Sequence, residues 1–173
     1  MHLLYFLTGF MLSMPAGVIA VYAAEPAYEK RLDEVAERGA HVMPFDLEKT
    51  IHIFLKTADG GIQQVIAKDT SDTEQIQLIR EHLLEISVEF SQGNFSRPER
   101  IHGESMPGLT VLKSANSEQL KIEYHELPEG AQINYSTRLS SFISAIHQWF
   151  DAQLSDHARH AIPGHTHKHM HHK

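Results

Sequence analysis

A chain of 173 residues is long enough to bury the core of one domain, and we expect a single one. Its 15 basic and 22 acidic residues give a net charge of −7 at pH 7, which argues against a nucleic-acid-binding protein. The chain has no cysteine, so a metal site would use histidine, methionine and carboxylate ligands. It does have 14 histidines, half of them in residues 157–173.

The N-terminal segment has the composition of an export signal. Residues 3–21 are almost wholly apolar and uncharged, and Ala23-Ala24 offers the small residues that a signal peptidase recognises. We therefore expect residues 1–24 to be a signal peptide and the protein to be periplasmic or secreted. The alternative is an uncleaved membrane anchor, because about 19 apolar residues just span a bilayer.

Residues 25–42 are highly charged and are predicted to be a spacer. Their apolar positions, Leu32 and Val35, are too few to anchor a core. The folded domain is expected to occupy residues 43–160.

The first half of this domain is predicted to be a hairpin followed by a helix. Alternating β-branched and aromatic residues indicate a strand over 50–56, and Asp59-Gly60-Gly61 indicates a turn into a second strand over 62–68. A cluster of N-cap residues at 69–72 then starts a helix that ends before Gly93.

Residues 92–109 form the longest irregular stretch, and loops of this length are often functional. Residues 109–112 are predicted to be a short strand. A second hairpin, with strands at 121–126 and 131–137, precedes a helix over 140–160.

The order of hairpin and helix thus occurs twice, at 50–91 and at 120–160. This ββα pseudo-repeat predicts an α+β fold. We expect a two-layer sandwich in which a four- to five-stranded, mainly antiparallel sheet carries two helices on one face.

The tail, residues 161–173, is predicted to bind transition metals. Closely spaced imidazoles on a chain with no reason to fold adapt to Cu(II), Ni(II) or Zn(II). The tail histidines are His165, His167, His169, His171 and His172. His157 and His160 lie three residues apart on one face of the predicted helix. They would anchor the tail around an ion, or else be exposed polar residues in a last helical turn.

A second, more selective metal site is predicted inside the domain. His52 lies on a strand, while His102 and Met106 share the long loop. Together with His147 or Met43 they form the mixed imidazole and thioether set that suits copper outside the cytoplasm. The competing interpretation is that these are ordinary core histidines.

This interior site is expected to be separate from the tail. His147 and His157 cannot share an ion if both lie on one straight helix, because ten residues rise about 15 Å. His82 and His125 are expected to be structural.

The chain resembles a poorly characterised family of small bacterial proteins. Matching phrases are Met43-Pro-Phe-Asp-Leu-Glu-Lys-Thr-Ile-His-Ile-Phe54, Asp59-Gly-Gly, Ile79-Arg-Glu-His-Leu83, Ile101-His-Gly-Glu-Ser-Met-Pro-Gly-Leu109 and Ala145-Ile-His-Gln-Trp-Phe-Asp-Ala-Gln-Leu-Ser-Asp-His157. They span residues 43–160. Family members are often labelled aspartate carbamoyltransferase, but this chain lacks the Ser-Thr-Arg-Thr-Arg carbamoyl-phosphate motif, so that activity is not expected. The resemblance implies no established activity.

The leading hypothesis is an exported transition-metal-binding protein that works in storage, delivery or resistance, with metal ions and envelope metal-handling proteins as partners. Copper is the expected metal, with zinc or nickel as alternatives, and no membrane contact is expected unless the N-terminal segment is uncleaved. A second hypothesis is a metal-dependent hydrolase or lyase that uses the internal histidines, with Glu104 as the candidate base. The third is a protein-interaction module. Motifs of nucleophilic or nucleotide-dependent catalysis are absent from the sequence.

Overall fold

The computed structural model describes residues 18–165. The elements run in the order α1 (Val18–Val42), η1 (Leu47–Lys49), β1 (Thr50–Thr57), β2 (Gly60–Ala67), α2 (Thr73–Ser91), α3 (Ser96–His102), α4 (Leu109–Lys113), β3 (Lys121–Leu127), β4 (Gly130–Ser136), α5 (Ser140–Asp156) and β5 (Ala161–Pro163).

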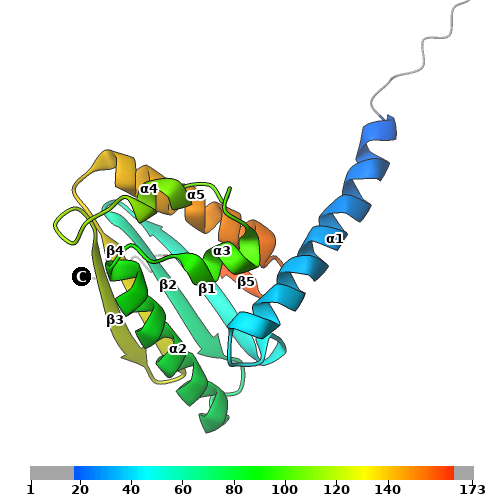
Figure 1. Ribbon diagram of the computed structural model, residues 1–173. Helices are drawn as coiled ribbons and strands as arrows, with labels where there is room; N and C mark the ends of the chain where they lie inside the picture. Colours follow the sequence, from blue (N-terminus) through cyan, green and yellow to red (C-terminus); the bar gives the residue numbers. More distant parts are fainter. Residues whose placement is uncertain (1–17, 166–173) are drawn as a thin grey trace, which may run out of the picture.

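Five strands form one sheet in the order β3-β4-β2-β1-β5. Three of the pairings are antiparallel, and the short β5 pairs in parallel with β1 at the edge. The helices α2 and α5 pack on one face of this sheet, with α3 and α4 beside them (Figure 1). The predicted α+β fold, with a mainly antiparallel sheet and helices on one face, is confirmed.

The period-two pattern of β1 decides which side chains enter the core. Thr50, His52 and Phe54 are buried beneath the helices, whereas Ile51 and Ile53 on the opposite face are only partly buried. The strand that the sequence predicts therefore carries one histidine directly into the space between sheet and helices.

Aromatic packing around Trp149 of α5 fixes that helix against the sheet and its neighbours. The indole makes edge-on contacts with Phe90 of α2, Phe95 before α3 and Tyr135 of β4, at centroid distances of 5.6–5.8 Å. All four side chains are almost completely buried. Such contacts contribute beyond simple burial, so the C-terminal end of α5 is held in a defined position.

The stretch 92–109 is less irregular than predicted, and the predicted strand at 109–112 is wrong. Residues 96–102 and 109–113 are the short helices α3 and α4. Leu109 and Leu112 are both fully buried, and their three-residue spacing places them on one helix face. Gly108 has a φ of 77°, and a Cβ there would lie 2.1 Å from the carbonyl oxygen of Ala145. Only glycine permits this close approach to α5.

Residues 25–42, predicted to be a spacer, belong to the helix α1. The prediction that Leu32 and Val35 are too few to anchor a core is wrong. Both side chains are buried, at 5% and 0% exposed. Two arginines supplement this small apolar contact: Arg31 reaches Asp156 and the carbonyl of His102, and Arg38 donates to the carbonyl of Ile101. The start of α1 extends beyond the body of the protein (Figure 1).

Most of the expected signal peptide or anchor lies outside the described residues. Within residues 18–165, no helix is long and apolar enough to cross a membrane.

The C-terminal boundary also differs from the prediction. The helix α5 ends at Asp156 rather than at 160, and His157 caps it. Residues 161–163, assigned to the tail, are the edge strand β5, which lies against His52, Ile53 and Phe54 of β1. The domain therefore continues to Pro163, and the chain turns sharply between α5 and β5.

Candidate metal site

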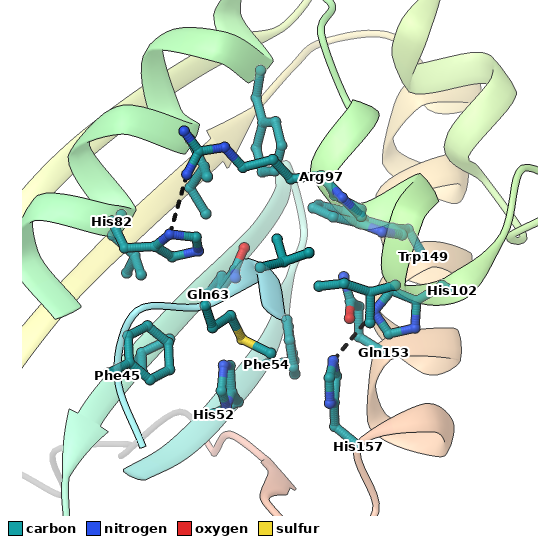
Figure 2. Close-up of a pocket in the computed structure, with 18 residues that line it drawn as sticks. Phe45, His52, Phe54, Gln63, His82, Arg97, His102, Trp149, Gln153 and His157 are labelled. Atoms are coloured by element: carbon teal, nitrogen blue, oxygen red, sulfur yellow. Dashed lines mark hydrogen bonds between the residues drawn. The ribbon is translucent and has the colours of Figure 1, made fainter. Parts of the chain in front are cut away.

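A small internal cavity lies between β1, β2 and the helices α2, α3 and α5. Its volume is about 50 Å³, enough for an ion or a few water molecules but not for a metabolite. Most of its wall is apolar. Its polar lining consists of four histidines, two glutamines and an arginine: His52, His82, His102, His157, Gln63, Gln153 and Arg97. Figure 2 shows these side chains around the cavity.

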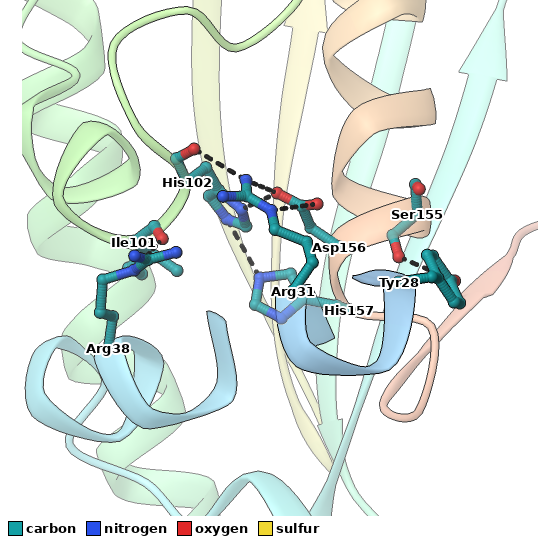
Figure 3. Close-up of polar contacts among 8 residues, drawn as sticks. All are labelled: Tyr28, Arg31, Arg38, Ile101, His102, Ser155, Asp156 and His157. Carbon is teal, nitrogen blue, oxygen red and sulfur yellow. Dashed lines mark hydrogen bonds and ion pairs between the residues drawn. The ribbon is translucent and has the colours of Figure 1, made fainter. Parts of the chain in front are cut away.

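His102 is held by a carboxylate at the end of α5. Its Nδ1 donates to Asp156 Oδ2 over 2.8 Å, and its side chain is 1% exposed. Arg31 of α1 donates to both oxygens of the same carboxylate and to the His102 carbonyl (Figure 3). Burial alone would raise the pKa of Asp156, but the hydrogen bonds from His102 and Arg31 lower it to about 2. With Nδ1 engaged in this way, the free nitrogen of His102 is Nε2.

His157 meets that free nitrogen. The two Nε2 atoms lie 3.2 Å apart, and the rings are almost perpendicular. On its other side, His157 stacks in parallel on His52, with ring centroids 5.5 Å apart and an angle of 5°. Three imidazoles, from α3, the turn after α5 and β1, therefore lie in one row that starts at Asp156.

Burial keeps two of these rings, His52 and His157, neutral. Desolvation, reinforced by the neighbouring histidines, lowers the pKa of His52 to about 3 and that of His157 well below its ordinary value. Nδ1 of His52 is buried and has no hydrogen-bond partner among residues 18–165. Such an atom costs free energy unless water or a bound ion satisfies it.

His82, expected to be structural, also lines this cavity. Its ring packs edge-on against Phe45, and its Nδ1 lies 3.4 Å from Arg97 Nη1. Burial and the positive charge of Arg97 lower the pKa of His82 to about 4. Arg97 is in turn paired with Glu85 and Glu89. The contact with Arg97 makes His82 a worse ligand than the other three histidines.

The structure separates His147 from the predicted interior site. Its Nε2 lies 3.0 Å from the carbonyl oxygens of both Thr57 and Gly60, so it closes the β1–β2 hairpin. Met106 is buried but lines a separate cleft with Arg31 and Ser155, whereas Met43 lines the cavity. Of the predicted set, His52 and His102 come together, and Met43 replaces Met106.

His157 and His160 do not share a helix face, because α5 has already ended. His157 turns into the cavity, while His160 pairs with Glu48 at 2.7 Å. His165 is exposed, and His167, His169, His171 and His172 lie outside the described residues. Metal binding by the tail stays a prediction.

Sequence reasoning missed the roles of Asp156 and Arg31. The only local indication was an acidic residue directly before His157 at the end of a predicted helix. The pairing with His102, 54 residues away, depends on how α3 packs against α5.

Within the described part of the chain, there is no group of three or more histidine, aspartate or glutamate side chains already arranged around a metal position. The two ring nitrogens that face each other belong to His102 and His157, and His52 is stacked on His157. Comparisons of the chain with protein-family models, with curated proteins and with solved structures found no match.

Proposed function

We propose that this protein binds a transition-metal ion at an interior site formed by His102 and His157, with His52 as a third ligand. The observation that carries the proposal is the 3.2 Å between the two Nε2 atoms. Two imidazole nitrogens at 2.0–2.1 Å from one ion at a tetrahedral angle lie about 3.3 Å apart. The pair thus already has the spacing that one ion requires.

The surroundings of His102 support the same function. In metal sites, a ligating histidine usually donates its other ring nitrogen to a carboxylate, which fixes the ring and increases its basicity. Asp156 has this relation to His102, and Arg31 fixes Asp156 in turn. An N–H···N hydrogen bond between His102 and His157 would have a similar length, and metal titration distinguishes the two arrangements.

His52 supplies the third donor after a modest ring movement. Its ring is stacked on His157 and does not yet point at the nitrogen pair, but its Nδ1 is buried and unpaired within the described chain. A ligand at that nitrogen would remove the cost of leaving it unsatisfied. The cavity is too small for the substrate of a hydrolase, and Glu104, the candidate base, is exposed and is not one of its lining residues.

The cellular role that fits such a site is storage, delivery or resistance outside the cytoplasm. The N-terminal segment has the composition of an export signal, and the chain without cysteine has only histidine, methionine and carboxylate ligands. In this proposal the histidines of residues 165–172 capture metal promiscuously, and the interior site holds it selectively. Envelope metal-handling proteins would be the partners.

The test is metal titration of a full-length variant whose five tail histidines, 165, 167, 169, 171 and 172, are changed to glutamine. This variant preserves β5, which a truncation at residue 162 would cut. We expect one site tighter than micromolar that His102→Gln weakens by at least about 100-fold. The matched control is His125→Gln, an exposed histidine on β3. If the tail variant binds copper, zinc and nickel no more tightly than micromolar, the proposal is wrong.

A further inference from the structure

The charge of the cavity wall limits which ion the interior site can hold. Among the described residues that line it, no side chain is a carboxylate, and the one cation, Arg97, is balanced by Glu85 and Glu89 outside the wall. Asp156, the nearest acid to the imidazoles, lies behind His102 and is already paired with Arg31. A divalent ion would therefore bring two positive charges into an apolar space with little compensation. Because the Born cost rises with the square of the charge, a monovalent ion costs only about a quarter as much.

The available donors favour the same choice. Imidazole nitrogens and a thioether sulfur are present, since Met43 lines the cavity and is 7% exposed. Thioether ligands select Cu(I) over harder divalent ions. The remaining wall is mostly aromatic and aliphatic, with side chains such as Phe54, Val65 and Trp149, and its other polar groups include the amides of Gln63 and Gln153. It offers none of the carboxylate ligands that Zn(II) commonly takes.

Coordination number is the third consideration. The structure presents two nitrogens at ligand spacing and one more imidazole alongside, and residues 18–165 provide no larger preformed group. Cu(I) accepts from two to four ligands and needs no particular plane, whereas Cu(II) prefers four or more in a tetragonal arrangement. A site with few, uncharged donors, one of them a soft sulfur, in a largely apolar cavity is suited to the monovalent ion.

We propose that the interior site binds Cu(I), through His102, His157 and His52 with the Met43 thioether, in preference to divalent ions. This inference rests on the proposed function, because it names the ion for the same site. The tail histidines would then differ from the interior in kind: solvated imidazoles suit Cu(II), Ni(II) or Zn(II), and the largely apolar cavity suits Cu(I).

The test compares three ions on the full-length variant that lacks the tail histidines. Cu(I) is supplied anaerobically with ascorbate and a chromogenic Cu(I) chelator as competitor, and Cu(II) and Zn(II) are titrated separately. We expect Cu(I) to bind at least about 100-fold more tightly than Zn(II). We also expect Met43→Leu to weaken the binding of Cu(I) by roughly tenfold and to leave the affinity for Zn(II) unchanged, because leucine conserves volume but lacks the sulfur.

The outcomes separate this inference from the proposed function. Tighter binding of Zn(II) or Cu(II) than of Cu(I), with loss on His102→Gln, would overturn the preference for Cu(I) and leave the metal site intact. An equal loss of affinity for all three ions in Met43→Leu would show a packing role for Met43 and would also overturn the preference for Cu(I). X-ray absorption of the Cu(I) complex gives an independent reading, since the proposal requires sulfur as well as nitrogen scattering. Failure of every ion to bind would refute both proposals.

Discussion

One histidine lies near the middle of α5 and another caps its C-terminal end, and the surroundings of the two differ. His147, near the middle of the helix, lies against two backbone carbonyls of the β1–β2 hairpin, which satisfy its Nε2. His157, just after the last turn, faces the Nε2 of His102 and stacks on His52, whose Nδ1 has no partner within residues 18–165. A histidine satisfied by the backbone holds the fold together, whereas the imidazoles that face one another are the ones we propose as ligands.

The largest effect should appear when the same substitution is made at these two positions. His157→Gln should weaken the interior metal site by at least about 100-fold with little change in the hairpin. His147→Gln should leave metal affinity unchanged but lower the free energy of unfolding by about 1 kcal/mol, because two carbonyls lose their donor. Both substitutions are made in the variant that lacks the tail histidines. Metal titration then measures the affinity, and urea denaturation measures the free energy of unfolding. Equal losses of affinity in the two variants would contradict the contrast.

The contrast also explains which parts of the molecule sequence reasoning could predict. The strands and hairpins follow from local alternation and turn residues, and the predicted β1 and β2 agree with the structure within a few residues. The sharing of one face of β1 by His52 and Phe54 follows from that alternation. In contrast, His147 was assigned to the site and His157 to the tail, and the structure reverses them.

That error has a physical cause at the end of α5. The sequence is compatible with a helix as far as residue 160, but α5 ends at Asp156 because residues 161–163 pair with β1. This parallel pairing is non-local, so no pattern near His157 indicates it. The packing of α1 was missed for a similar reason: its few apolar residues are supplemented by Arg31 and Arg38, whose acceptors lie more than 60 residues away.

A smaller effect is expected from the carboxylate behind His102. Asp156→Asn should reduce metal affinity by about 10- to 100-fold, because an amide orients the imidazole less firmly and lowers its basicity. The matched control is Asp151→Asn on the same helix, where the carboxylate pairs with Lys56 and is largely exposed. Calorimetric titration of both variants provides the measurement. An affinity equal to that of the parent protein in Asp156→Asn would remove Asp156 from the site.

His82 is the cavity histidine that is not a proposed ligand, and its expected effect is on stability rather than on metal affinity. The unfolded chain protonates it near pH 6.5, whereas burial and Arg97 keep it neutral in the folded protein down to about pH 4. Between these values the unfolded state binds more protons, so the free energy of unfolding falls as the pH falls, by at most about 1.4 kcal/mol per pH unit from this residue. His82→Gln should flatten the pH dependence of urea denaturation of the metal-free protein between pH 6.5 and 4, and His125→Gln should not. An unchanged slope of the free energy of unfolding against pH in His82→Gln would mean that His82 is protonated in the folded state. The cavity would then hold two adjacent positive charges, at positions 82 and 97, rather than one.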